Sequence, residues 1–436
     1  MEEIRRVRVE DVLHARDERA GRQQMLLARH HAPLISFTMN IAGEIKYDPQ
    51  IRRAFEEGIR RILRQTERMN LPILERIETT DFTGCEALFS VQADAQALKE
   101  AMCLIEESDA LGRLFDIDVL DASGAHLSRG SERLCLICGK PARACARSRA
   151  HDASELFQKA HEIIESHFQE EFFRYIGETA QRALLHEALT TPKPGLVDCE
   201  NSGAHSDMNI MSFADSACVL RPYFEACARM GAQNGSLLRL QYAGQQAEDA
   251  MFSAANANTH KGAIFSLGIL CYAAGFCGEQ ADTNDILRKS AETGAFFLEQ
   301  MEKSSRFETG GEQQFRQYGL TGARGEAASG FESVQAIALP VLRQAVASGM
   351  TLQQAGLCAL MSLMKSVNDS NVIRRAGMEG QKFVMEQANR ALDEGCSEEI
   401  LREMNRTFVR RGVSPGGSAD LLAAAYFLYF IETRGA

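Results

Sequence analysis

The 436-residue chain lacks both a long apolar run and an excess of positive charge, and each absence excludes a class of protein. No stretch approaches the roughly 18 apolar residues that a membrane span requires, and the charged start MEEIRRVRVEDV lacks the apolar core of a secretory signal. The 48 lysines and arginines are outnumbered by 59 aspartates and glutamates, which gives a formal charge of −11. Broad nucleic-acid binding needs a net basic surface that displaces counterions, so the composition argues against it. We expect a cytoplasmic protein with no membrane span and no nucleic-acid partner.

The pattern of apolar residues changes once along the chain. Residues 1–152 mix period-two and helical segments, which predicts an α+β domain with strands at 33–41, 73–82, 86–93 and 112–121 and helices at 9–30, 50–69 and 94–108. Residues 153–436 predict a larger all-α domain, with helices at 154–190, 207–231, 260–278, 283–302, 331–348, 351–366, 371–394, 397–410 and 418–433. Internal repeats and low-complexity tracts are absent. The chain is therefore expected to be multidomain, with its boundary near residues 150–155.

One loop of the second domain, in TPKPGLVDCENSGAHSDMN, gathers ionisable residues between two predicted helices. Lys193 lies between two prolines, and Asp198, His205 and Asp207 follow within fourteen residues. A cation and several hard carboxylate oxygens in one loop suit a polyphosphate with a metal ion. The alternative is a solvated loop whose polar residues only cap the next helix.

Four further polar or glycine-rich clusters stand where predicted helices begin, in NTHKGAIF, LTGARGEAASGF, NDSNVIRRAG and SPGGSADLLA. A helix start favours an anion through its free N–H groups and its dipole, but ordinary capping explains any one cluster equally well. Five clusters in one helical domain could converge on the mouth of a bundle, where such folds build their sites. The candidate binding residues in these clusters are His260, Lys261, Gly322, Arg324, Gly325, Asp369, Asn371, Ser418 and Asp420. The glycine-rich stretch is not a Walker A loop, because it lacks the Gly-Lys-Ser/Thr ending.

In the first domain, LFDIDVLD places Asp116 and Asp118 two positions apart on a predicted strand, so both carboxylates point to one face. Such a pair can hold Mg²⁺ against a polyphosphate, with Arg113 beside it, although an exposed polar face gives the same pattern. No Gly-Ser loop precedes the aspartates, so we do not assign a nucleotidyltransferase-like fold.

The remaining cysteine motif is Cys135-x2-Cys138-x6-Cys145-x5-His151, in a basic segment. The spacing suits a zinc knuckle, but a second Cys-x2-Cys pair is lacking and the apolar residues between the first two cysteines also suit a buried strand. Since no secretory signal precedes the twelve cysteines of the chain, we expect reduced thiols and no disulfide framework. The basic residues around the motif suit phosphates, an acidic partner or a solvated linker.

Several of these stretches resemble two known families. Residues about 10–151, with RQQMLLARHHAPLISFTMNIAGEIK, GRLFDIDVLD and CLICGKPARACARSRAH, resemble the citrate lyase holo-acyl-carrier-protein synthases, which are phosphoribosyl-dephospho-CoA transferases. Residues about 175–433, with TPKPGLVD, NSGAHSDMN, NTHKGAIFSLG, YGLTGARGEAASGF, NDSNVIRRAG and SPGGSADLLA, resemble the triphosphoribosyl-dephospho-CoA synthases. The second resemblance is long and has many separate motifs, whereas the first covers its domain with shorter signatures.

The resemblance implies a bifunctional transferase that makes and attaches the prosthetic group of citrate lyase. In the C-terminal domain, the ribose 2′-hydroxyl of 3′-dephospho-CoA would attack C1′ of ATP and expel adenine. In the N-terminal domain, a serine of the apo acyl-carrier (gamma) subunit of citrate lyase would attack the α-phosphorus of that product and expel pyrophosphate.

Breaking the N-glycosidic bond needs a carboxylate near the oxocarbenium, a general acid and a general base, and in-line phosphoryl transfer needs metal and positive charge. Our candidates are Asp198, Asp207 and Glu326 for carboxylate roles, His205 for proton transfer, and Lys193, Lys261 and Arg324 for the triphosphate. The candidates for Mg²⁺ are Asp116, Asp118, Asp198 and Asp207.

Two other functions use the same residues. A metal-dependent ATP phosphohydrolase or kinase would need the same charged clusters, and a nucleotide- or CoA-sensing scaffold would bind a carrier protein through the basic segment. Product identification distinguishes them, since only the transferase releases adenine.

Overall fold

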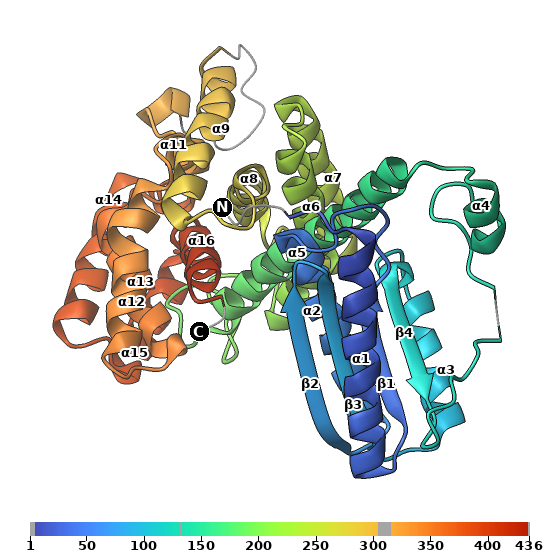
Figure 1. Cartoon of the computed structure of the whole chain (residues 1–436). Helices are drawn as coiled ribbons and strands as arrows, with labels where there is room; N and C mark the ends of the chain where they lie inside the picture. The colour runs from blue at the N-terminus through green and yellow to red at the C-terminus, as the bar shows by residue number, and fades with distance from the viewer. Residues whose placement is uncertain (1–4, 131, 304–314, 435–436) are drawn as a thin grey trace. The chain divides into compact units, whose positions relative to one another are not determined.

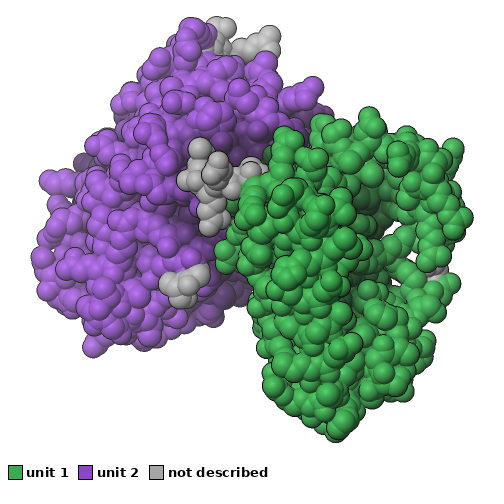
Figure 2. Space-filling model, viewed as in Figure 1, with its two compact units in different colours: residues 1–170 green, residues 171–436 purple. Residues whose placement is uncertain are grey.

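The computed structural model describes residues 5–130, 132–303 and 315–434, which form two compact units, 1–170 and 171–436 (Figures 1 and 2). The first is α+β and the second is all-α, as the sequence predicts. The 37-residue helix α5 (Ala153–Leu189) begins at the boundary expected from the sequence, and the division between the units falls within this helix. The boundary at 152/153 therefore stays a prediction. Within the described residues, no helix is both long and apolar enough to cross a membrane.

The first unit is a four-stranded antiparallel sheet with helices on both faces (Figure 1). The strand order is β2-β3-β1-β4. The elements of this unit before α5 are α1 (Val9–His30), β1 (Leu34–Met39), α2 (Pro49–Arg68), β2 (Ile73–Asp81), β3 (Gly84–Val91), α3 (Ala95–Glu107), the 3₁₀ turn η1 (Gly112–Leu114), β4 (Phe115–Leu120) and α4 (Ala142–Ser148).

The two faces of this sheet carry different side chains because strand residues alternate. Phe37, Phe89 and Phe115 belong to the large apolar core, which also includes apolar residues of α2 and α3. On the other face, Leu26 of α1 packs in a small leucine cluster. In the same layer, Glu86 pairs with Arg19 and Arg22 of α1. The helix α1 therefore covers a mixed, partly polar face, and this is the face that carries the Asp-x-Asp pair of β4.

Where the structure describes it, the second unit has helices and no strand. Its elements after α5 are α6 (Ile210–Ala232), α7 (Leu237–Ala255), α8 (Lys261–Cys277), α9 (Thr283–Lys303), α11 (Gly322–Ala328), the π-helical turn η2 (Val334–Ala338), α12 (Leu339–Ala347), α13 (Leu352–Ser366), α14 (Ser370–Asp393), α15 (Glu398–Arg411) and α16 (Gly416–Glu432). The helix α7 lies where we expect none from the sequence, because its buried face is sparse: Leu240, Ala247 and Met251.

The helices α8 and α16 form the centre of this unit and pack against each other. Nearly every residue from Ala263 to Gly275 and from Ser418 to Leu428 is buried. Such helices, apolar on all sides, belong inside a large core. Alanines 423–425 of α16 let the neighbouring helices approach closely. The central packing places the polar starts of both helices, His260–Gly262 and Gly416–Asp420, beside one cavity.

Candidate functional site

The helical unit encloses a cavity of about 1600 Å³ lined by residues between 187 and 423. All five polar clusters predicted from the sequence contribute to it. Of the candidates in this unit, those that line it are Lys193, His205, Asp207, His260, Lys261, Gly322, Arg324, Gly325, Glu326, Asp369, Asn371 and Asp420. Asp198 and Ser418 are absent from its lining.

Lys193 lies in the loop between α5 and α6 and is 1% exposed. Its Nζ donates to the carbonyl oxygen of Glu187, at 2.6 Å, and to Glu187 Oε1, at 2.5 Å. A buried ammonium with a carboxylate partner forms a charge-assisted pair whose loss would leave one charge uncompensated. Glu187 also lines the cavity, and sequence reasoning missed it because it reads as an ordinary residue of a long helix.

Asp198 holds the same loop in shape. Its Oδ2 accepts a hydrogen bond from the backbone N–H of Lys193 at 2.8 Å, and its Oδ1 accepts from the N–H groups of Glu200 and Asn201 at 2.8 and 2.9 Å. Both oxygens of this buried carboxylate are therefore occupied by backbone donors. This geometry supports a role in positioning Lys193.

His205 and Asp207 lie on the following stretch of the loop. His205 Nε2 is 2.8 Å from Ser414 Oγ, and Arg375 Nη2 is 3.4 Å from its Nδ1. Burial, and then the charge of Arg375, lower the pKa of His205, so the imidazole is neutral at neutral pH. The Asp207 carboxylate is exposed and lies 3.9 Å from the imidazole.

His260, at the start of α8, lines the cavity and has one buried polar atom without a hydrogen-bond partner among the described residues. Its Nδ1 lies 2.7 Å from Ser216 Oγ, while the buried Nε2 makes no hydrogen bond to any described residue. Burial and the positive charge of Lys193 lower the pKa of His260 to about 3. The ring is thus a neutral imidazole, and when Ser216 donates to Nδ1 the opposite nitrogen carries the proton. That N–H is available to an acceptor on a ligand.

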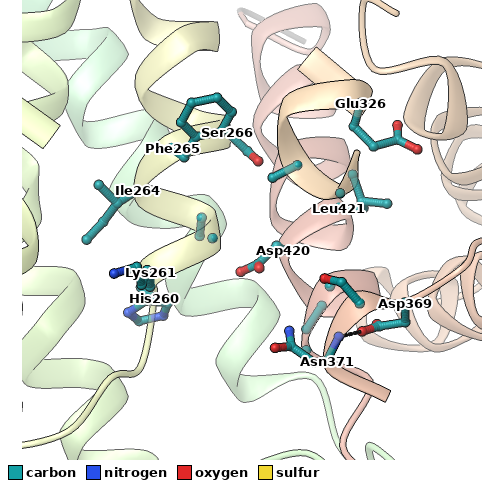
Figure 3. Close-up of a pocket in the computed structure, with 18 of the residues that line it drawn as sticks. His260, Lys261, Ile264, Phe265, Ser266, Glu326, Asp369, Asn371, Asp420 and Leu421 are labelled. Atoms are coloured by element: carbon teal, nitrogen blue, oxygen red, sulfur yellow. Dashed lines mark hydrogen bonds between the residues drawn. The ribbon is translucent and has the colours of Figure 1, made fainter. Parts of the chain in front are cut away.

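Asp420 links the starts of α16 and α8 (Figure 3). Its carboxylate accepts a backbone hydrogen bond from Ala263, and a Cβ at Gly262 would lie 1.9 Å from Asp420 Oδ2. Position 262 therefore has room only for glycine. Burial, and then the negative charges of Glu187 and Asp369, raise the pKa of Asp420 well above its usual range.

Asp369 caps α14 and ties it to α16. One of its oxygens accepts from the N–H groups of Asn371 and Val372, at 2.9 and 3.3 Å, and the other accepts from the N–H and hydroxyl of Ser418, at 2.8 and 3.1 Å. Burial raises the pKa of Asp369 despite these bonds. Ser418 does not line the cavity and holds the Asp369 carboxylate in place, whereas Asn371 lies on the cavity wall.

The glycine-rich stretch forms the short helix α11. Glu326 Oε1 accepts a hydrogen bond from the Ser333 hydroxyl at 2.6 Å, and Oε2 accepts from the Ser333 N–H at 3.3 Å. Burial raises the pKa of Glu326, so its carboxyl is a stronger base than an exposed glutamate.

The positive side chains on the cavity wall come from several elements. Lys261 Nζ is 2.6 Å from Glu248 Oε2 of α7. Arg324 lines the wall from α11, and Arg374 and Arg375 line it from α14. We did not predict the two α14 arginines, although they stand in the quoted stretch NDSNVIRRAG.

In the α+β unit, Asp116 and Asp118 lie on the same face of β4, as the spacing predicts, where they oppose Thr38 and Ser36 of β1. Arg133 Nη1 is 3.3 Å from Asp116 Oδ1. Arg113 donates to the carbonyl oxygens of Leu134 and Cys135, at 2.9 and 3.3 Å. The aspartates thus lie beside the basic segment, and Arg113 braces that segment.

The four proposed zinc ligands also lie together. The Sγ atoms of Cys135, Cys138 and Cys145 and one ring nitrogen of His151 are all within 4.8 Å of one another.

Comparison with known proteins matches each unit to a protein family. Residues 173–436 match the family model of ATP:dephospho-CoA triphosphoribosyl transferase, and residues 7–167 match that of apo-citrate lyase phosphoribosyl-dephospho-CoA transferase. Protein CitXG of Haemophilus influenzae is 34% identical, with 99% of this chain and 97% of the relative covered. Protein CitXG of Leuconostoc mesenteroides subsp. cremoris is 31% identical, with 97% of each chain covered. The 2-(5''-triphosphoribosyl)-3'-dephosphocoenzyme-A synthase of Pectobacterium atrosepticum is 40% identical over 59% of this chain and 90% of its own length. The chain therefore belongs to the ATP:dephospho-CoA triphosphoribosyl transferase family, with an apo-citrate lyase phosphoribosyl-dephospho-CoA transferase domain preceding it, and resembles the CitXG proteins over nearly its whole length.

Proposed function

We propose that the helical unit binds ATP and 3′-dephospho-CoA in its cavity and joins them with release of adenine. The observation that carries the proposal is one cavity of about 1600 Å³ that combines buried carboxylates, arginines and lysines, and an imidazole N–H that has no partner in the described part of the chain. The volume exceeds the 300–1,000 Å³ that is usual for a single small ligand, which suits two nucleotide substrates.

In this reaction the 2′-oxygen of dephospho-CoA forms a bond to C1′ of the ATP ribose, and the bond from C1′ to the adenine nitrogen breaks. The 2′-hydroxyl loses a proton and the departing adenine gains one, so both atoms and charge balance. The triphosphate stays on the transferred ribose.

Asp420 is our candidate for the group that receives the 2′-proton. Its pKa is raised by burial and by Glu187 and Asp369, and a raised pKa brings a carboxylate closer to the best range for general-base catalysis at neutral pH. Glu326, with its pKa raised by burial, is our candidate for stabilising the positive charge that develops on the ribose.

His260 is suited to donate a hydrogen bond from Nε2 as a neutral group, because its low pKa prevents it from taking up a second proton at neutral pH. The triphosphate would lie against Lys261, Arg324, Arg374 and Arg375, since arginine and lysine are the usual phosphate ligands.

The carboxylates also fit a Mg²⁺ ion. Burial, and then the negative charges of Glu187 and Asp369, raise the pKa of Asp420, and hard carboxylate oxygens are the ligands that Mg²⁺ prefers. When bound, the ion would neutralise charge on the triphosphate. Asp207 is our candidate to hold it, because its exposed carboxylate lines the cavity, whereas each Asp369 oxygen already accepts two hydrogen bonds and Asp420 is assigned to proton transfer.

We infer that the α+β unit transfers the product to a serine of the apo acyl-carrier subunit of citrate lyase. The serine oxygen forms a bond to the α-phosphorus as the bond to pyrophosphate breaks, and the serine proton is lost. Asp116 and Asp118 are suited to Mg²⁺, with Arg133 supplying positive charge beside them.

Product identification by mass tests both steps. The full chain, mixed with Mg²⁺, ATP and dephospho-CoA, should release adenine in step with the loss of dephospho-CoA. Addition of apo acyl-carrier subunit should then release pyrophosphate and increase the mass of the carrier. Formation of ADP or inorganic phosphate in place of adenine would indicate a kinase or phosphohydrolase and refute the proposal. Tight ATP binding without turnover would indicate a sensing scaffold.

A further inference from the structure

Residues 132–151 of the first unit, which we call the cysteine segment, form a turn and the short helix α4. Together they bring Cys135 and His151 close to each other. The N–H of Cys135 donates to the carbonyl of Lys140 at 2.7 Å, and the N–H of Gly139 donates back to Cys135 at 3.2 Å. Gly139 has a φ of 69°, which glycine adopts at little cost. This turn holds Cys135 and Cys138 on one side.

The helix α4 and the residues that follow it supply the other two candidate ligands. Cys145 lies on this helix, and Arg149 ends it in a left-handed conformation with a φ of 46°. The N–H of Ala150 then donates to the carbonyl of Cys145 at 3.1 Å, so that His151 folds back toward the thiols.

The distances fit a tetrahedral ion. All four ligand atoms lie within 4.8 Å of one another, and the sulfurs of Cys138 and Cys145 are 3.4 Å apart. A zinc ion with Zn–S bonds of about 2.3 Å places its sulfur ligands about 3.7 Å from one another. Small side-chain adjustments would therefore bring all four atoms into the first coordination sphere.

The histidine is oriented as zinc-ligating histidines usually are. His151 Nδ1 lies 3.5 Å from Glu155 Oε2, and the imidazole also interacts with the Cys138 thiol. In metal sites a carboxylate commonly holds one ring nitrogen while the other binds the ion. The imidazole of His151 therefore lies between a carboxylate and a thiol, as that of a zinc-ligating histidine does.

The segment also lacks an apolar core of its own. Among residues 132–151 only Cys135 is buried. Segments with so little buried apolar surface commonly rely on a metal or a disulfide. The three thiols form no disulfide in the structure.

We propose that Cys135, Cys138, Cys145 and His151 bind one structural Zn²⁺ ion. Binding displaces the thiol protons and leaves a centre with three thiolates and one neutral imidazole. Four protein ligands leave no open position for a substrate, so the ion has a structural role. It would hold the basic segment that carries Arg133 beside Asp116 and that accepts the hydrogen bonds of Arg113. This last consequence rests on the proposed transferase role of Asp116, whereas zinc binding does not.

Metal analysis of the full chain tests the proposal. We expect about one zinc per chain after purification from zinc-replete cells and removal of loosely bound metal. The variants Cys138→Ser and Cys145→Ser should retain less than about a tenth of that zinc. Cys218→Ser is the matched control, because this exposed cysteine lies on α6 and should leave the zinc content unchanged.

Two further measurements keep the test independent of folding. The variant His151→Cys keeps a four-ligand set and should retain zinc, whereas His151→Ala should lose most of it. Cobalt in place of zinc should give the intense visible bands of tetrahedral thiolate coordination. A zinc-free wild-type chain, equal zinc in Cys138→Ser and Cys218→Ser, or a Cys138–Cys145 disulfide in place of bound metal would each overturn the proposal. Because adenine release does not enter these measurements, failure of the proposed function would leave their result unaffected.

Discussion

Replacement of Asp420 by asparagine should stabilise the helical unit while it abolishes adenine release. The asparagine keeps the shape of the side chain and an oxygen that accepts from Ala263, but removes the charge that burial, Glu187 and Asp369 disfavour. A group whose pKa is raised on folding costs stability wherever it must ionise. We therefore expect the ionised Asp420 carboxylate to lower the stability of the helical unit while it supports adenine release.

The pH dependence follows from the direction of the pKa shift. Below the pKa of the unfolded aspartate, about 3.9, both states are protonated and the substitution should have little effect on stability. As pH rises from there toward the raised folded pKa, the wild-type protein loses up to about 1.4 kcal/mol per pH unit relative to Asp420→Asn. Above the folded pKa the difference is constant. Since about 1 kcal/mol shifts the melting temperature of a unit of this size by roughly 2–4 °C, calorimetry can measure the effect.

The assay compares wild type, Asp420→Asn and the control Asp249→Asn without ligands at about pH 5 and about pH 7. Asp249 is an exposed carboxylate on α7 away from the cavity wall, so its substitution should change stability by less than about 0.5 kcal/mol. Adenine release by Asp420→Asn should fall at least about 100-fold, the size expected for the loss of a general base. A melting temperature at pH 7 at or below that of the wild type, or undiminished adenine release, would refute the reasoning.

Three further predictions concern the other charged groups. Lys193→Met leaves the buried Glu187 carboxylate without its partner and should destabilise the unit by about 3–5 kcal/mol, measured by denaturant unfolding. The double variant with Glu187→Gln should recover most of the lost stability, and equal instability of the single and double variants would contradict a charge effect. Glu326→Gln should retain ATP binding, measured by calorimetry, but lose adenine release. If ATP binding is lost as well, the residue acts in substrate binding. Asp116→Ala should abolish labelling of the carrier subunit while adenine release continues, and loss of both activities in a folded variant would contradict the assignment of the two chemistries to separate units.

The sequence predicted the helices and strands well where apolar periodicity is strong. The helix α1 and the strands β1, β2 and β4 lie within the expected ranges, and β3 begins two residues before its expected start, because each of these elements has a face committed to a core. The helix α7 was missed, since only a thin line of its residues is buried and Gly244 and several glutamines interrupt the pattern.

The candidate site could be predicted as a group of residues but not as a set of roles. Polar clusters at helix starts are visible in the sequence, and their convergence follows once the apolar helices α8 and α16 pack together. Whether a carboxylate faces the cavity or the backbone depends on loop geometry that periodicity does not encode. Asp198 and Asp420 look alike in sequence, yet the first accepts backbone hydrogen bonds beneath the loop and the second lies on the cavity wall. The partner of Lys193 could not be predicted because Glu187 reads as an ordinary residue of the long helix α5.

The cavity wall is assembled from segments between residues 187 and 423 that are distant along the chain. A substrate that fills the cavity and contacts several of them would act as a reversible cross-link within the helical unit. Ligand present at about 100 times its dissociation constant adds about 2.7 kcal/mol to the stability of the folded state. Local unfolding at the start of α8, α11, α14 or α16 would then require the ligand to dissociate first. Substrate supply would thereby set the lifetime of the folded helical unit in the presence of proteases as well as the rate of its reaction.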